Sequence, residues 1–172
     1  MTAWQAVLTL QCMWTSEFAR EETIQIQAPA STVFDYVADV RRHPEWAAQR
    51  LQVRARGRDT DPLNTYDSTA RLGLPIRGTI RIVSAEPPLR FAYECEDMSG
   101  HHLWTMSLRT VGGGSRLTMR VERLAGPLWV RLLQPILMWP LVGRPGVRKA
   151  LVNIKRSVEA KFVLPVEKGG LP

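Results

Sequence analysis

The chain has 172 residues, of which 45% are hydrophobic and 23% are charged. This length and composition fit one globular domain with its own core and exclude a disordered or fibrous protein. The net charge is +7, and residues 126 to 172 supply +6 of it, so the basic character belongs to the C-terminal part. Cys12 and Cys95 match no disulfide or metal-binding spacing, which favours a reducing compartment.

The first 21 residues precede the predicted domain as an N-terminal extension. Their apolar run follows no basic residue and lacks a small-residue cleavage site, which argues against a signal peptide. Its large apolar residues recur at spacings of three and four, as on one helix face: Trp4, Val7, Leu10, Trp14 and Phe18. We expect an extension over residues 1–21, a single domain over 22–163 and a tail over 164–172.

The segment after the extension predicts a strand followed by two short helices. Alternation at Ile24 and Ile26 predicts the strand. Apolar residues at helical spacing follow Pro29 and predict the first helix, with Ser31 as its N-cap. Pro44 disfavours a helical conformation at the residue before it, so the chain turns again there.

From Gln52 onward the hydrophobic period is two, with turn residues between the runs. Short turns at this spacing make neighbouring strands antiparallel. The expected strands lie near residues 52–58, 67–74, 76–85, 89–97, 101–111 and 115–123.

Alternation along these strands separates an apolar face from a charged one. Arginine and glutamate residues dominate the second face, so this face of the sheet is exposed to solvent. The apolar face has to pack against other elements of the fold. Asp97 and Ser84 are further polar candidates for the covered face. The apolar face is expected to carry Val53, Ala55, Ala70, Leu72, Ile80, Ile82, Phe91, Tyr93, Cys95, His102, Trp104, Met106, Leu108, Leu117, Met119 and Val121.

The cover is a long amphipathic helix near the C-terminus. Pro145 stands near its start, where proline is tolerated. Basic and polar residues separate apolar positions that recur at spacings of four, three, four and four: Val147, Leu151, Ile154, Val158 and Phe162.

Several stretches together resemble the START, Bet v 1 and polyketide cyclase superfamily. They are "IQAPASTVFDYVADVRRHPEW", "RGTIRIVSAEPPLRFAYE", "GSRLTMRVE" and a terminal helix containing "IKRSVEAK". The resemblance covers about residues 22–163 and implies an α+β helix-grip fold. In that fold a strand, two short helices and six strands form a curved antiparallel sheet around the C-terminal helix, with an apolar cavity between them.

The same resemblance implies that the apolar face lines a pocket for a hydrophobic ligand, instead of being core throughout. Tyr93 and His102 are the polar groups suited to fix the ligand and are the candidates for catalysis, although neither is assigned a catalytic role. No metal or cofactor motif is present, so none is expected. The expected ligand-binding residues are Val53, Leu72, Ile80, Ile82, Phe91, Tyr93, Cys95, His102, Trp104, Met106, Leu151, Ile154 and Val158.

The stretch "GPLWVRLLQPILMWPLVG", residues 126–143, is apolar except for Arg131. That charge and the prolines at 127, 135 and 140 argue against a membrane span and predict short helical pieces ending near Pro135 and Pro140. One reading is a lid with Trp129, Leu132, Leu133 and Met138 buried. The other is contact with an anionic membrane surface through Trp129, Leu133, Leu137, Met138 and Trp139.

Three functions remain open from the sequence, the third of them an interaction protein that uses its hydrophobic patch to dimerise. The first is non-enzymatic binding or transport of a hydrophobic small molecule or lipid. The second is a cyclase, aromatase or dehydratase acting on a polyketide-like or aromatic substrate in the same pocket. We expect a cytoplasmic protein that is a monomer or weak dimer. If the second reading of residues 126–143 holds, it is also peripheral to a membrane. It should not bind nucleic acid, because no recognition motif accompanies the basic residues.

Overall fold

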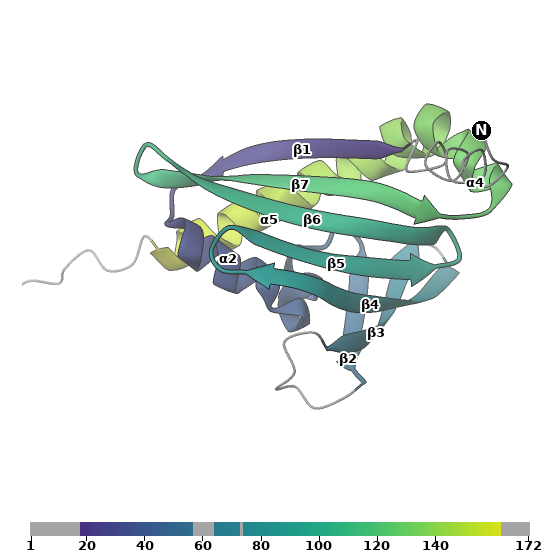
Figure 1. Cartoon of the computed structure of the whole chain (residues 1–172), viewed down its shortest axis with the longest axis horizontal. Helices are drawn as coiled ribbons and strands as arrows, with labels where there is room; N and C mark the ends of the chain where they lie inside the picture. Colours follow the sequence, from purple (N-terminus) through teal and green to yellow (C-terminus); the bar gives the residue numbers. More distant parts are fainter. Residues whose placement is uncertain (1–17, 57–63, 73, 163–172) are drawn as a thin grey trace, which may run out of the picture.

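A computed structural model describes residues 18–56, 64–72 and 74–162. Its centre is one curved sheet of seven antiparallel strands in the order β1-β7-β6-β5-β4-β3-β2 (Figure 1). The strands are β1 (Ala19–Ile26), β2 (Arg50–Ala55), β3 (Thr65–Leu72), β4 (Leu74–Glu86), β5 (Arg90–Asp97), β6 (Gly100–Val111) and β7 (Gly114–Ala125). All six strands expected after Gln52 are present, with ends that differ by a few residues.

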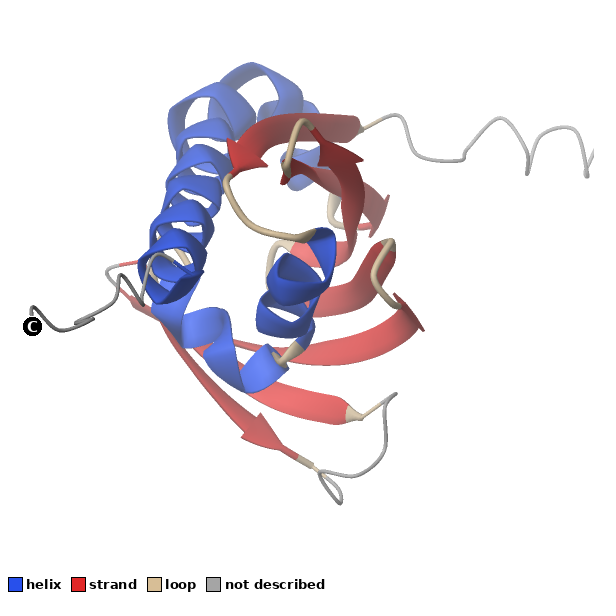
Figure 2. Ribbon diagram, turned by 90° about the vertical axis from the view of Figure 1, so that its left-hand side faces the viewer, coloured by secondary structure: helices blue, strands red, loops and turns tan. Residues whose placement is uncertain are grey.

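Helices lie on the concave side of the sheet (Figure 2). The segment between β1 and β2 forms α2 (Ala30–Ala38), the 3-10 helix η1 (Val40–Arg42) and α3 (His43–Trp46). After β7 the chain runs through α4 (Leu128–Leu133), the π-helix η2 (Gln134–Gly143) and α5 (Arg144–Phe162). This arrangement is the helix-grip fold that the sequence predicted.

The strand register confirms the assignment of the two faces. Tyr93 pairs with Ile82 on one side and with Trp104 on the other, so these side chains point to the same face. A bulge between Ile82 and Ser84 shifts the register and pairs Ser84 with Ala92. The expectation of an inward Ser84 is therefore wrong, because the extra residue of a bulge reverses the alternation beyond it.

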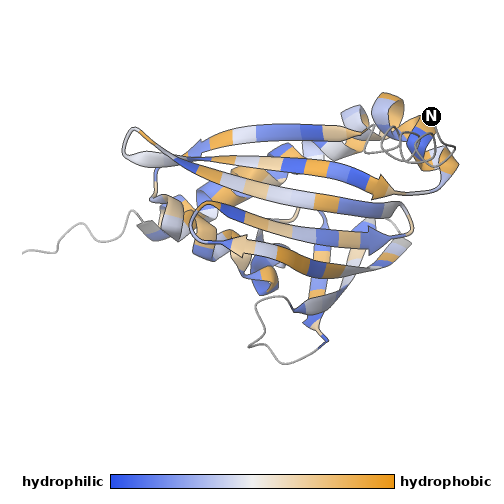
Figure 3. Cartoon of the chain, viewed as in Figure 1, coloured by the Kyte–Doolittle hydropathy of each residue, from blue (hydrophilic) through white to orange (hydrophobic). Residues whose placement is uncertain are grey.

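The convex face carries the charged side chains, which form ion pairs across neighbouring strands. Arg56 pairs with Asp67, and Glu94 accepts from Arg81 and lies 3.2 Å from His101 Nε2. Figure 3 shows the alternation of polar and apolar residues along the strands. A sheet with one wet face has to bury the other, and α2, α3 and α5 provide that cover.

Helix α5 buries the apolar seam that its spacing predicted. Val147, Leu151, Ile154 and Val158 are all buried, and they belong to one cluster with the sheet, α2 and α3. Residues between them on the outer side of α5, such as Val152, remain exposed. The burial of each large aliphatic side chain contributes about 2 kcal/mol to folding.

Ionic contacts fix α5 to the edge strand β1. Glu22 accepts hydrogen bonds from Arg144 Nε at 2.6 Å and Arg148 Nε at 3.0 Å. Burial alone would raise the pKa of Glu22, but these two guanidinium groups outweigh it and lower that pKa. Farther along α5, Lys155 donates to the Gln25 carbonyl and to Glu159, which itself accepts from the Gln27 backbone N–H.

Two local expectations about helix ends are corrected. Helix α2 begins at Ala30 with Pro29 in the cap position and no side-chain cap, so Ser31 is not the N-cap. The first helical piece after β7 does end near Pro135, but the second continues through Pro140 to Gly143. In a π-helix the hydrogen bonds join residues five apart, and Pro140, which donates none, lies inside this helix without ending it.

Substitution on the two sides of α5 should separate core packing from helix propensity. Ile154 is 0% exposed and Val152 is 44% exposed. Ile154→Ala should lower the free energy of unfolding by about 2 to 5 kcal/mol, because it leaves a cavity in the core. Val152→Ala should change it by less than about 0.5 kcal/mol. Urea unfolding followed by circular dichroism measures both, and equal losses would contradict the role given to this seam.

Candidate ligand-binding site

Most side chains of the concave face are buried, and a few toward one end of the sheet are partly exposed. Near α2, Phe91 on β5 and Met106 on β6 are fully buried. Farther along the same strands, Cys95 and Trp104 are partly exposed. In Figure 1 this end of β5 and β6 lies at the right, on the side of α4. We call the α4 end of this face, where Cys95 and Trp104 are partly exposed, the open end; the residues paired with them, Ile80 and Val121, are buried.

An aromatic cluster occupies the middle of the concave face, with His43 at its centre. The His43 ring lies 4.5 Å from the Trp46 ring and 5.1 Å from the Tyr93 ring, measured between centroids. Tyr93 in turn stacks on Trp104 at 6.3 Å with an interplanar angle of 7°. The cluster thus extends from the buried interior to the partly exposed Trp104.

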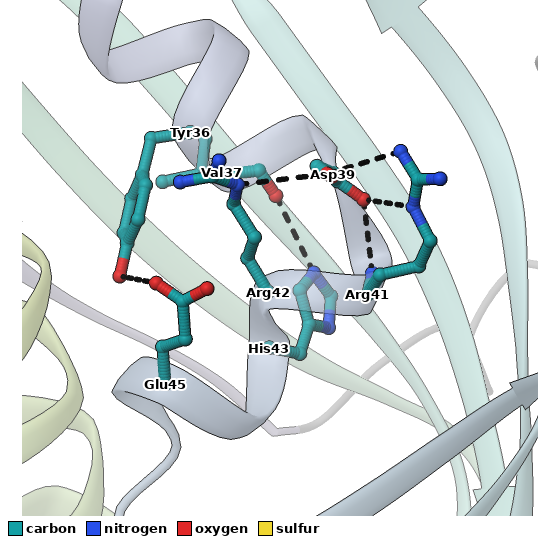
Figure 4. A network of polar contacts seen from close by, with 7 residues as sticks. All are labelled: Tyr36, Val37, Asp39, Arg41, Arg42, His43 and Glu45. Carbon is teal, nitrogen blue, oxygen red and sulfur yellow. Dashed lines mark hydrogen bonds and ion pairs between the residues drawn. The ribbon is translucent and has the colours of Figure 1, made fainter.

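His43 was not among the residues singled out from the sequence. Its neighbours in "DVRRHPEW" are mostly charged, and a turn was expected there, which favours an exposed side chain. In the structure η1 and α3 fold back, and the His43 ring points toward Val37 of α2 (Figure 4). The one signal in the sequence for a buried His43 was its position three residues before Trp46, which places both side chains on the same face of a short helix.

The polar contacts of His43 fix its tautomer. Its Nε2 lies 3.3 Å from the Val37 carbonyl oxygen, which can only accept, so Nε2 carries the proton. Burial lowers the pKa of His43 to about 4, against the opposing effects of the Val37 carbonyl and Asp39. The ring is therefore neutral at pH 7, and its Nδ1 is an unprotonated acceptor.

Two further interactions hold the segment that carries His43 (Figure 4). The Asp39 carboxylate accepts from the backbone N–H and the Nε of Arg41, and it lies 3.6 Å from Arg42 Nε. On the other side, the Tyr36 hydroxyl donates to Glu45 at 3.0 Å. These contacts join α2 to η1 and α3, and they position the imidazole in the interior.

Tyr93 and Cys95 are weak acids in this environment. Burial, with a smaller effect of Cys95, raises the pKa of Tyr93, so its hydroxyl stays protonated. Burial, followed by the nearby Asp97, raises the pKa of the Cys95 thiol to about 12. Within the described part of the chain, the Tyr93 hydroxyl has no hydrogen-bond partner, and neither has the buried Nε1 of Trp46. These groups suit hydrogen bonding to a ligand better than proton transfer.

At the open end a small polar cluster joins the sheet to η2. Gln134 Nε2 lies 3.4 Å from His102 Nε2, and Arg123 Nη1 donates to Gln134 Oε1. Burial lowers the pKa of His102, and Arg123 and His101 add to this, whereas Asp97 opposes it. His101 lies on the convex face with Glu94, so the two adjacent histidines point apart, as alternation predicts.

The helical segment after β7 exposes most of its apolar side chains. Among the residues expected to touch a lid or membrane, Trp129, Leu133 and Leu137 are exposed, whereas Met138 and Trp139 are partly buried. The reading in which Trp129, Leu132 and Leu133 are buried is therefore wrong. Trp139 packs edge-on against the buried Phe18 at 5.7 Å, which fixes the inner side of η2.

An open cleft of about 780 Å³ lies elsewhere, beside the edge strand β2. Of the expected ligand-binding residues it contains Val53, and its lining is about as polar as apolar. It does not include the aromatic cluster. Its lining residues are Arg41, Pro44, Leu51, Gln52, Val53, Arg54, Asp67 and Thr69.

The expected ligand-binding residues, Val53 included, lie on the concave side, most of them in the core. Val53, Cys95 and Trp104 are partly buried against this core, and His102 is buried beside Gln134. Leu72 belongs to β3, but its side chain lies outside the described residues. Those in the core are Ile80, Ile82, Phe91, Tyr93, Met106, Leu151, Ile154 and Val158.

Among the described residues, no group of three or more His, Cys, Asp or Glu side chains could hold a metal ion. No described helix is both long and apolar enough to cross a membrane.

The sequence matches a family model described as "Polyketide cyclase / dehydrase and lipid transport" over residues 18–159. The chain belongs to this family. Membership in the polyketide cyclase/dehydrase and lipid transport family implies binding of a hydrophobic ligand or a polyketide cyclase-type role. A comparison with curated proteins finds no match.

Solved structures share the fold of this family member at low sequence identity. Protein CV1439 from Chromobacterium violaceum is 16% identical with a TM-score of 0.64, over 83% of this chain and 98% of the other. TTHA0849 from Thermus thermophilus is 18% identical with the same TM-score, over 84% and 99%. The di-domain ARO/CYC StfQ from the steffimycin biosynthetic pathway is 15% identical with a TM-score of 0.64, over 84% of this chain and 52% of that chain. These similarities show the fold alone.

The buried imidazole should make this family member sensitive to mild acid. The pKa of His43 is about 4 when folded, against about 6.5 for an unperturbed histidine. Between these values the unfolded state binds more protons, so the free energy of unfolding falls as the pH is lowered. His43 alone should remove about 2 kcal/mol between pH 7 and pH 5.

His43→Gln keeps a donor for the Val37 carbonyl but cannot titrate, so it should flatten this pH dependence. Urea unfolding at pH 7, 6 and 5 measures how the free energy of unfolding depends on pH. These pH values lie above the range in which most carboxylates titrate. Val152→Ala, an exposed substitution that removes no titratable group, is the control and should retain the wild-type slope. A slope unchanged in His43→Gln would show that the ring does not stay neutral in the fold.

Proposed function

We propose that the protein binds a hydrophobic small molecule or lipid between the concave face of the sheet and α5, as a carrier without catalytic activity. The observation that carries this proposal is the partial exposure of Trp104 and Cys95 on a face that is otherwise apolar and buried. A folded protein gains stability by covering such side chains, and a ligand at the open end would complete that cover.

The polar groups near this face support a ligand with one polar end. The Tyr93 hydroxyl stays protonated and has no partner within the described chain, so it can donate to a ligand carbonyl or hydroxyl. His102 lies nearer the α4 end and is already in contact with Gln134. Trp104, stacked on Tyr93, offers a flat apolar surface between the two. The arrangement therefore suits a mostly apolar molecule oriented by one or two hydrogen bonds.

A cyclase, aromatase or dehydratase acting on a polyketide-like substrate is the second candidate function. The family description and the buried His43 and Tyr93 favour it. The protonation behaviour of these groups weighs against it, because general acid or base catalysis works best with a pKa near the working pH. His43 is too weak a base at a pKa of about 4, and the raised pKa of Tyr93 makes it a poor acid. Positioning of a reactive substrate would have to supply most of the rate.

Filling the open end should abolish ligand binding. Cys95→Trp puts a large side chain on the concave face, whereas Glu96→Trp puts the same side chain on the convex face of the same strand. In native mass spectra of protein purified without detergent, the wild type and Glu96→Trp should carry a stoichiometric hydrophobic adduct. Cys95→Trp should lose at least nine-tenths of it, with its urea midpoint recorded as the folding control.

Two outcomes would contradict the carrier. One is an adduct that persists in Cys95→Trp, because the ligand would then sit elsewhere. The other is a wild-type spectrum without adduct that stays unchanged after incubation with fatty acids, quinones and aromatic polyketides. Turnover of such a substrate, lost in Tyr93→Phe while binding is retained, would instead establish the enzyme.

A further inference from the structure

An exposed apolar stripe runs along the outer side of α4 and η2. Its members are between 44% and 79% exposed, and most of them form pairs of neighbours that repeat every four residues, as on one helix face. Soluble proteins rarely leave so many large apolar side chains contiguous and exposed unless they bind something. We call these residues the outer stripe: Leu128, Trp129, Leu132, Leu133, Ile136, Leu137, Leu141 and Val142.

The opposite side of the same helices is held by the fold. Val130 is fully buried, Trp139 packs against Phe18, and Gln134 is bonded to Arg123. The outer stripe therefore points outward because its helix is anchored by the other face. This is the reverse of an ordinary surface helix, which turns its apolar side to the core.

The surroundings of the outer stripe are basic. No acidic residue occurs between Glu122 and Glu159, whereas seven arginines and lysines do. Arg144, Arg148 and Lys149, at the start of α5, are exposed. One carboxylate, that of Glu22, accepts from two of them, which leaves this end with excess positive charge.

We propose that the outer stripe docks the protein on the surface of an anionic lipid bilayer, with its apolar side chains inserted and the start of α5 facing the head groups. Charge complementarity selects this occupant. A second copy of the chain would bring the same basic residues together across a symmetric contact, whereas anionic lipids neutralise them. Exposed tryptophan beside leucine, isoleucine and basic residues is also the composition of interfacial helices.

Flotation of the full chain with lipid vesicles tests this without any cavity ligand, so its result is independent of the proposed carrier function. The vesicles are phosphatidylcholine alone or with 30% phosphatidylglycerol. Binding should be at least tenfold tighter to the anionic vesicles, and it should weaken as salt is raised from 0.05 to 0.5 M.

A matched pair of double variants separates the outer stripe from general hydrophobicity. Leu132→Ser with Ile136→Ser removes two stripe residues and should weaken binding to anionic vesicles at least tenfold. Leu89→Ser with Val111→Ser removes exposed residues at the α2 end of the sheet and should leave binding unchanged; Leu89 is 61% exposed and Leu132 is 62% exposed. All four substitutions are at exposed positions, and urea midpoints equal to the wild type will show that both variants fold.

Three results would overturn the proposal. The first is equal binding to neutral and anionic vesicles, or no binding to either. The second is a stripe variant that binds like the wild type. The third is a wild-type mass in solution that doubles with concentration and reverts in the stripe variant, which would assign the outer stripe to a second copy.

Discussion

One face of the sheet is polar and exposed to solvent, so its other, apolar face has to be covered. The packing of α5 on this apolar face governs most of the structure. Ile154 and Leu151 are buried against strands that are distant in sequence, and Glu22 ties the same helix to the edge strand β1. The cover buries Phe91 and Met106 fully near α2 and leaves Trp104 and Cys95 partly exposed toward α4. These two partly exposed positions are where we propose that a ligand reaches the interior.

Patterns of period two and of helical spacing were enough to predict the order of the elements and the face of most strand residues, and the family resemblance supplied the helix-grip fold. They could not predict the bulge that turns Ser84 outward, because a bulge is one extra residue within an unbroken alternation. They also missed His43, whose burial arises when η1 and α3 fold against α2 and depends on contacts that local sequence does not specify. The stretch after β7 was ambiguous for a related reason. Its residues are apolar on all sides, so no periodicity says which of them face out.

The chemical character of the interior follows from desolvation. Burial keeps His43 neutral and Tyr93 protonated, and it keeps the Cys95 thiol from ionising. An interior that neutralises its own titratable groups offers hydrogen bonds and apolar surface but little acid or base strength. The ionised groups are found on the convex face and at the ends of the fold, in pairs such as Arg56 with Asp67.

The helices after β7 follow one another without a connecting loop. The residues that cap η2 at both ends, Leu133 and Arg144, have right-handed helical backbone angles, so α4, η2 and α5 are continuous from Leu128 to Phe162. A π-helix of ten residues is unusually long, and this one contains no fully buried side chain. Val147 and Leu151, which are buried, therefore lie on the same uninterrupted helical backbone as η2, in which no side chain is buried.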